Sequence, residues 1–293
     1  MKDAIIGSMM NYNVQQLKPW VESLENSGFT GDKYMLCYQI SYEAATYLRS
    51  RGFTLFTFID VPHINMYTCQ PEKCFHICVH RFYHMWHFLN KLPDDVKRNY
   101  RYLISTDVGD VIFQSNPSDW LGENMTCADG TSYMLNAATE SLKYKDEVLW
   151  GAKNMADSFG PLVSDYMKDR LIYNAGTLSG DYQTVVDMFL VIYEMCQGFG
   201  TCNPDQAAYN LLLSLAPYKR ITKFNMSEDG WACQLGTTYK PEALVHFKEN
   251  LVEPSPIIDE HGIVYTSTGK PFVIVHQYNR MPDLTQKIMM RYM

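Results

Sequence analysis

The alternation of strand and helix signals over the first 60 residues constrains the fold more than any other feature of the sequence. Apolar runs of strand length alternate with patterns of helical period. The expected elements are strands over 4–10, 33–38 and 54–59 and helices over 14–28 and 42–51. Strand-helix-strand units of this length form right-handed crossovers between parallel strands. The order therefore predicts an α/β fold with a mixed, mainly parallel central sheet flanked by helices, and this half has the architecture of a nucleotide-binding unit.

The remainder of the chain continues without a repeat, a linker or a low-complexity tract. An irregular stretch over 60–75 precedes a helix over 76–91 and a strand over 100–105. The second half is expected to contain strands over 132–138, 171–178, 232–235, 263–266 and 272–276 and helices over 145–158, 181–197 and 204–215. Gly and Pro residues over 254–271 suggest a hairpin, and a last helix is expected from Pro282. We therefore expect a single domain over 1–293.

Composition limits the partners and the compartment of the protein. A formal charge of −7 gives no basic surface for a polyanion, which argues against nucleic acid as a partner. No apolar run reaches the roughly 18 residues of a membrane span. The apolar stretch at the N-terminus is too short for a signal peptide. The eight cysteines lack the spacing of a disulfide scaffold. We expect a soluble, cytoplasmic protein.

Two carboxylates follow the strand expected over 100–105. Asp107 and Asp110 fall where ligands bind in open α/β sheets, beyond the carboxyl end of a strand. Buried carboxylates are costly without a compensating positive charge, and Mg²⁺ or Mn²⁺ held by oxygen ligands supplies it. Such a cation stabilises negative charge on a leaving diphosphate. Gly109 between the acids would allow a tight turn close to phosphates. The alternative is that Asp107 caps the turn and Asp110 lies in solvent.

Three further segments carry polar residues at ends of predicted elements. Asn174 precedes a small Ala-Gly pair that is expected to clear space beside it, and its amide suits sugar hydroxyls, although a plain turn would explain it too. Asp205 and Gln206 open a helix that also carries Asn210; capping explains Asp205 alone but not the combination. His276 ends an apolar strand and is either a structural histidine or a third metal ligand.

The order of these segments resembles that of the GT-A glycosyltransferases of the glycogenin and bacterial lipopolysaccharide galactosyltransferase type. The resemblance rests on strand-Asp-x-x-Asp, Asn-Ala-Gly, Asp-Gln-x-x-x-Asn and strand-His, and is strengthened by the segments Thr106–Gln114 and Val275–Tyr278. It implies a Rossmann-like GT-A fold. The sequence departs from the family in two places: the usual acidic motif is Asp-x-Asp, and Gly109 replaces an arginine of the most similar group.

The resemblance also implies roles for individual residues. Metal binding, of Mn²⁺ or Mg²⁺, falls to Asp107, Asp110 and His276, with Asp107 alternatively contacting the ribose. The sugar and acceptor site falls to Asn174, Asp205 and Gln206. Binding of the nucleotide-sugar donor falls to Ser8, Met9, Asn11, Arg81, Asp107 and Gly109. The nucleotide-binding half is expected over about 1–115 and the acceptor and sugar half over about 116–293.

The implied activity is transfer of a sugar from a UDP- or GDP-linked donor to a hydroxyl of a glycan or glycoconjugate, with retention of configuration. An inverting enzyme would need a carboxylate base, for which Asp205 is the first candidate and Glu140 the second; otherwise Glu140 is expected to be an exposed acid at the start of a helix. One alternative is a non-catalytic protein that binds nucleotides or glycans on the same fold. Another is a sugar nucleotidyltransferase, but Gly7–Lys18 lacks the glycine-rich loop that such an enzyme normally has.

Overall fold

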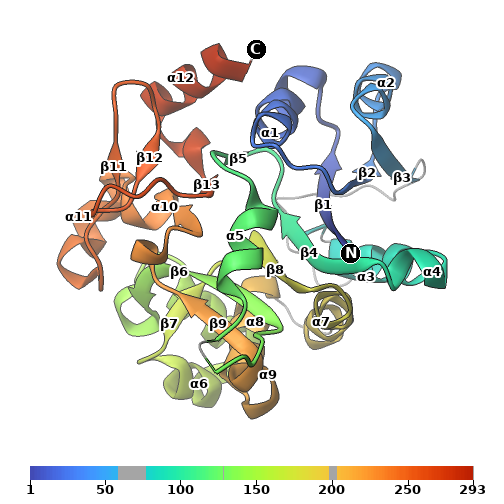
Figure 1. Cartoon of the computed structure of the whole chain (residues 1–293). Coiled ribbons are helices and arrows are strands. Elements are labelled where there is room, and N and C mark those ends of the chain that lie inside the picture. The colour runs from blue at the N-terminus through green and yellow to red at the C-terminus, as the bar shows by residue number, and fades with distance from the viewer. Residues whose placement is uncertain (59–76, 128, 198–202, 293) are drawn as a thin grey trace.

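The computed structural model describes residues 1–58, 77–127, 129–197 and 203–292 (Figure 1). The irregular stretch expected over 60–75 lies outside them. The strands are β1 (Lys2–Met10), β2 (Asp32–Tyr38), β3 (Phe53–Phe58), β4 (Tyr100–Thr106), β5 (Val111–Phe113), β6 (Leu135–Lys143), β7 (Leu171–Tyr173), β8 (Thr177–Asp181), β9 (Thr222–Asn225), β10 (Ala232–Gln234), β11 (Ile257–Ile258), β12 (Val264–Tyr265) and β13 (Ile274–His276).

The helices follow the same order along the chain. They are α1 (Val14–Asn26), α2 (Tyr42–Ser50), α3 (Ile77–Asn90), α4 (Asp94–Lys97), α5 (Pro117–Asn124), α6 (Gly151–Met167), α7 (Tyr182–Met195), α8 (Asp205–Ser214), α9 (Ala216–Ile221), α10 (Leu235–Thr238), α11 (Pro241–Phe247) and α12 (Pro282–Tyr292). None of the helices in the described part of the chain is long and apolar enough to cross a membrane.

A mixed, mainly parallel sheet of eight strands forms the centre of the molecule, as the sequence predicts. Its strand order is β3-β2-β1-β4-β8-β6-β7, with β9 beside β6. The four strands from β3 to β4 run parallel, joined by helices. β8 runs antiparallel to both β4 and β6, and so joins the two halves of the chain in one sheet. The carboxyl ends of β1 and β4 therefore lie side by side at one edge.

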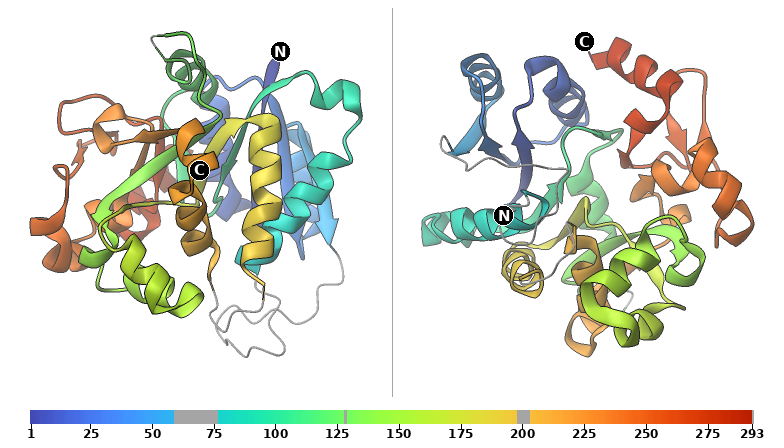
Figure 2. Two further views of the ribbon diagram at one scale, coloured as in Figure 1. Left: turned by 90° about the horizontal axis from the view of Figure 1, so that it is seen from below. Right: turned by 180° about the vertical axis from the view of Figure 1, so that it is seen from behind.

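Helices cover both faces of the parallel strands because neighbouring side chains of a strand point to opposite faces. In β1, Ala4 and Ile6 join a core with α3 and α7, whereas Ile5 and Met9 join a core with α1 and α2. The two views of Figure 2 and Figure 1 agree on this layering. A fully buried strand that packs on both faces reads as a continuous apolar run, as this one does.

A second sheet of three strands joins distant parts of the sequence. β13 lies between β10 and β5, parallel to β10 and antiparallel to β5. Its register places His276 opposite Val111, so the end of the chain meets the turn that follows β4. β11 and β12 pair as the hairpin expected over 254–271. α12 then packs against α1, which closes this side of the molecule (Figure 1).

Several element boundaries differ from the sequence-based expectation. The strand expected over 171–178 is two strands, β7 and β8, separated by a turn at 174–176. The helix expected over 145–158 begins only at Gly151, because the Glu147 carboxylate accepts the backbone N–H of Trp150 and Gly151. It continues past a kink at Gly160, where φ is 81°, to Met167. β5 and β9 have no expected counterpart.

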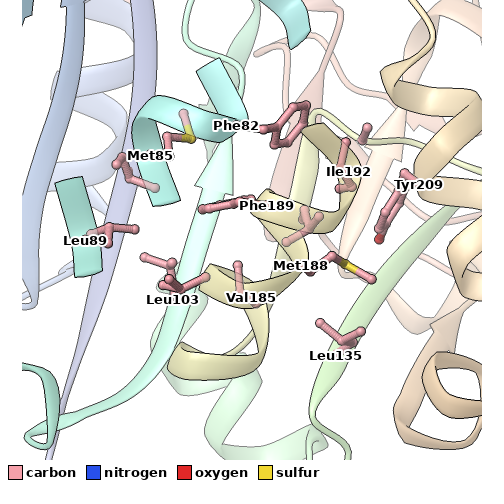
Figure 3. Close-up of a cluster of buried hydrophobic side chains, with 14 of the residues drawn as sticks. Phe82, Met85, Leu89, Leu103, Leu135, Val185, Met188, Phe189, Ile192 and Tyr209 are labelled. Atoms are coloured by element: carbon pink, nitrogen blue, oxygen red, sulfur yellow. The ribbon is translucent and has the colours of Figure 1, made fainter. Parts of the chain in front are cut away.

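Phe189 tests how far stability depends on the core between the sheet and α3. Its side chain is fully buried on α7, and its ring centroid lies 5.7 Å from that of Phe82 (Figure 3). Phe189→Ala leaves a cavity that the surrounding side chains cannot close, and should lower the free energy of unfolding by about 3–5 kcal/mol in urea denaturation. The control Met290→Ala, on the exposed face of α12, should change it by less than about 0.5 kcal/mol. A loss at Phe189 below about 1 kcal/mol would contradict this packing.

Candidate active site

The three side chains predicted to bind a metal meet at the edge of the sheet. Asp107 and Asp110 occupy the turn between β4 and β5, and His276 is the last residue of β13. His276 Nε2 lies 3.5 Å from Asp107 Oδ2 and 3.5 Å from Asp110 Oδ1. One ligand atom from each residue lies within 4.8 Å of the others. The Asp110 side chain is only 21% exposed, so the alternative that places it in solvent is wrong.

The orientation of His276 suits a metal ligand. Gln234 donates from Nε2 to Thr177 Oγ1 at 3.1 Å, which leaves its Oε1 to accept from His276 Nδ1 at 2.7 Å. Nε2 is then the nitrogen that faces the two carboxylates. Burial disfavours a charged imidazole, but Asp110 and Asp107 outweigh it and raise the pKa of His276 to about 9. A divalent cation would take the place of that proton, because two carboxylates and one imidazole can ligate such a cation.

Gly176 leaves the space in which these groups meet. A Cβ at this position would lie 2.7 Å from Asp107 Oδ2 and 2.8 Å from His276 Cε1. Its carbonyl accepts the backbone N–H of Asp107 at 3.0 Å, which ties the 174–176 turn to the acidic turn. The small Ala-Gly pair was expected to clear space beside Asn174. The space at Gly176 accommodates the Asp107 carboxylate and the His276 imidazole in addition to the Asn174 amide.

Gly109 is required for a reason that the sequence does not disclose. Its backbone φ is not positive, so no left-handed turn calls for glycine here. A Cβ at Gly109 would instead lie 2.6 Å from the hydroxyl oxygen of Tyr12, whose ring packs directly on the turn. Close packing on Tyr12 is thus a reason for glycine beside the expected tight turn, which residues 109–110 do form. Tyr12 also lines the cleft, and no sequence pattern pointed to it.

Arg81 binds two carboxylates at once. From α3 its guanidinium donates to Asp107 Oδ1 and, at 3.5 Å, lies against Asp205 Oδ2 at the start of α8. Burial would raise the pKa of Asp107, but Arg81 and His276 together hold it well below the usual range. For Asp205, burial outweighs Arg81, and its pKa is raised. Arg81 was predicted to contact the sugar donor; in this structure it compensates buried acids of the site.

Two amides converge on Glu140. Asn174 Nδ2 and Gln206 Nε2 donate to the same Glu140 oxygen, Oε1, at 2.7 and 3.0 Å. Asn174 Oδ1 accepts the backbone N–H of Gly176 at 2.7 Å, so both ends of this amide have protein partners. Glu140 was expected by default as an exposed acid at the start of a helix. That expectation is wrong, because β6 continues to Lys143, and Glu140 is 6% exposed within it. Burial raises the pKa of this carboxyl.

Asn210 explains why the Asp-Gln pair and an asparagine occur together. Its Oδ1 accepts the backbone N–H of Tyr173 at 2.8 Å, and its Nδ2 donates to the Tyr173 carbonyl at 2.7 Å. It also donates to the Gln206 carbonyl at 2.8 Å. Asn210 therefore fastens α8 to β7 one turn after Gln206. Its role is to hold the helix start that presents Asp205 and Gln206.

A cleft of about 1060 Å³ contains these groups. Every residue predicted to bind the donor, the sugar or the metal lines it, except Asn11. Asn11 is exposed and has a left-handed backbone with φ 55°, and its N–H donates to the Tyr38 carbonyl. The lining also includes Trp150, Lys240 and Arg280, which sequence reasoning missed because no local pattern marks them.

No protein-family model matches the chain, and no curated protein matches it in sequence. Solved structures do match it in fold. The bifunctional glycosyltransferase WbbM superposes with a TM-score of 0.56 at 12% identity, over 98% of this chain. The match covers 49% of WbbM, so the chain spans about half the length of that enzyme.

Two further glycosyltransferases show the same likeness. The galactosyltransferase LgtC, solved with donor and acceptor sugar analogs, has a TM-score of 0.53 at 13% identity, and the match covers 97% of this chain and 95% of LgtC. GlyE of Streptococcus pneumoniae has a TM-score of 0.51 at 13% identity, covering 94% of this chain and 54% of GlyE. The chain therefore has the fold of the GT-A glycosyltransferases.

Proposed function

We propose that the protein is a metal-dependent glycosyltransferase that moves a sugar from a UDP- or GDP-linked donor to a hydroxyl of a glycan or glycoconjugate. The observation that carries the proposal is the convergence of Asp107, Asp110 and His276 on one cleft, at the carboxyl ends of the parallel strands. Ligands bind at this edge in open α/β sheets. Mn²⁺ or Mg²⁺ held there would stabilise the negative charge that develops on a leaving diphosphate.

The end of β1 supports binding of the nucleotide part of the donor. Ser8 and Met9 line the cleft beside the acidic turn, and the Tyr12 ring packs on Gly109. An aromatic ring at this position offers a face for a nucleobase or ribose. The proposal assigns the nucleoside to this side of the metal group and the sugar to the side of Asn174 and Gln206.

Arg280 is the cation that the proposal assigns to the diphosphate. It lies four residues after His276, at the end of a 3₁₀ turn, and lines the same cleft. A Cβ at Gly236 would lie 2.5 Å from its Nη1, so the guanidinium rests on the backbone of α10. Within the described ranges no carboxylate pairs with Arg280, whereas Arg81 is engaged with two. Guanidinium groups bind phosphate through paired hydrogen bonds.

Retention of configuration is part of the proposal. An inverting reaction needs a carboxylate that accepts the proton of the acceptor hydroxyl. Asp205 is ion-paired with Arg81, and Glu140 already accepts two amide hydrogen bonds on one oxygen. Burial nevertheless raises the pKa of both carboxyls, so these contacts do not decide between the two outcomes, and the proposal of retention rests on the Asn174 and Asp205-Gln206 segments.

Replacement of Asp110 tests the metal-dependent activity. Wild-type protein should release UDP or GDP from at least one donor in a panel of UDP- and GDP-sugars with Mn²⁺, and EDTA should abolish the release. Asp110→Asn removes a negative ligand and should lower this rate by about 100-fold or more. The control Asp165→Asn, at an exposed acid of α6, should leave the rate unchanged. Binding of nucleotide by calorimetry without turnover of any donor would point to a non-catalytic protein instead.

Gln234 tests whether His276 is held as a ligand, independently of turnover. Gln234→Leu removes the acceptor of the His276 Nδ1 proton and should weaken Mn²⁺ binding about 10- to 100-fold, measured by electron paramagnetic resonance titration of free Mn²⁺. Gln114→Leu is the matched control, since in the described part of the chain that amide bonds to backbone groups of Val264 and Phe272. Equal Mn²⁺ affinity in both variants would remove His276 from the proposed ligand set.

Arg280 tests the assignment of the diphosphate. Arg280→Ala should raise the KM for the sugar donor about tenfold, because a charge-assisted hydrogen bond to phosphate is lost. Arg280→Lys should recover part of this loss through its charge alone. Arg98→Ala, at an exposed arginine after α4, serves as the control. An unchanged donor KM in Arg280→Ala would refute a role for this side chain in diphosphate binding.

A further inference from the structure

Trp150 is exposed at the cleft, whereas the other four tryptophans are buried or half-buried. Its side chain is 43% exposed, whereas Trp20, Trp120 and Trp231 are at most 6% exposed and Trp86 is half-buried. Both Trp150 and its neighbour Leu149, at 53%, line the same cleft as Asp110. Large apolar side chains left open beside a cleft mark a surface that a ligand covers.

The loop that carries Trp150 is fixed rather than loosely attached. The Glu147 carboxylate accepts the backbone N–H of Trp150 at 2.9 Å and that of Gly151. The carbonyl of Trp150 accepts the backbone N–H of Asn154 at 2.8 Å, and the Asn154 side chain donates to the Asn203 carbonyl at 2.9 Å. The indole is therefore presented from a backbone with satisfied hydrogen bonds, which is how a preorganised binding surface is built.

Glu140 provides a polar group deeper in the same cleft. Its Oε1 is held by Asn174 and Gln206, while its Oε2 has no hydrogen-bond partner among the described residues. That oxygen does not belong to the fully buried unpaired atoms of the described residues, so it is open to the cleft and can accept a hydrogen bond from water or from a hydroxyl of a ligand. Asn174 also accepts a hydrogen bond from Gly176, which lies next to Asp107. Glu140 is therefore connected through these two residues to the proposed metal ligands.

The charge of the cleft limits what can lie along this wall. Six carboxylates and three lysine or arginine side chains line it. A divalent cation and a diphosphate nearly cancel each other, so the excess of carboxylates remains when a donor is bound. An anionic ligand beside Trp150 would be repelled, whereas an uncharged ligand rich in hydroxyls would not. The volume of about 1060 Å³ is at the upper end for a ligand site, and so has room for two substrates.

We propose that Trp150 and Glu140 bound an acceptor subsite for an uncharged saccharide, which stacks a ring face on the indole and donates a hydroxyl to Glu140. The apolar face of a pyranose matches an aromatic ring, and its hydroxyls match the carboxylate and amides. This inference rests on the proposed function, since it names the acceptor class for the same cleft. It assigns the choice of acceptor to the wall of the cleft that residues 147–151 form.

Saccharide binding by variants of Trp150 tests the inference. An array of neutral, sulfated and sialylated glycans with a threonine-rich peptide identifies the best ligand, and calorimetry then measures its affinity. A neutral glycan should bind best, Trp150→Ala should weaken it about tenfold or more, and Trp150→Phe should keep it within about threefold. Leu162→Ala is the matched control, because Leu162 is 87% exposed on α6 and does not line the cleft.

Three results would overturn the inference: preference for an acidic glycan or the peptide, no glycan binding, or equal affinity in Trp150→Ala and wild type. Steady-state kinetics adds a second readout, since Trp150→Ala should raise the KM for the acceptor and leave the KM for the donor within about twofold. Failure of the two proposals is distinguishable. Glycan binding that depends on Trp150 without any donor turnover would sustain the subsite and refute the transferase.

Discussion

The cleft depends on one buried cation. Arg81 brings α3, the end of β4 and the start of α8 together, because its guanidinium contacts Asp107 and Asp205 at once. Carboxylates taken out of water are stable only with a partner, and loss of that partner typically costs about 3–5 kcal/mol. Asp107 divides its two oxygens between Arg81 and His276. The ion pair therefore fixes one side of the metal group before any ligand arrives, and leaves Asp110 as the less constrained acid.

Small residues and amides then give the site its shape. A side chain at Gly176 would displace His276 and Asp107, and a side chain at Gly109 would displace the Tyr12 ring. Asn210 and Gln234 act through a neighbouring residue. Asn210 holds the start of α8 against β7, and Gln234 holds the imidazole of His276. The residues that a sequence pattern marks as polar are thus of two kinds. Some face the cleft, and others hold the ones that do.

The parallel half of the fold could be predicted from sequence because its signals are local. The strands over 4–10 and 33–38 are short apolar runs, each followed by a helix with a side-chain N-cap, Asn13 for α1 and Ser41 for α2, and the crossovers set the parallel direction of the strands. The direction of β8 could not, since antiparallel insertion between β4 and β6 depends on contacts with residues far along the chain. Glu140 was misplaced for the same reason: its burial follows from β6 being central. Tyr12 and Trp150 carry no local signal at all.

The pairing of β13 with β5 has a consequence for the order of folding. Val111 and His276 are opposite each other in this sheet although 165 positions separate them in the chain. Closing so long a loop is slow and entropically costly, and it follows the formation of local units. During synthesis, strands β1 to β4 can assemble while His276 has not yet been made. The complete set of three ligands is therefore a property of the finished chain, and a shortened chain that ends before β13 would keep the acids but lack the imidazole that faces them.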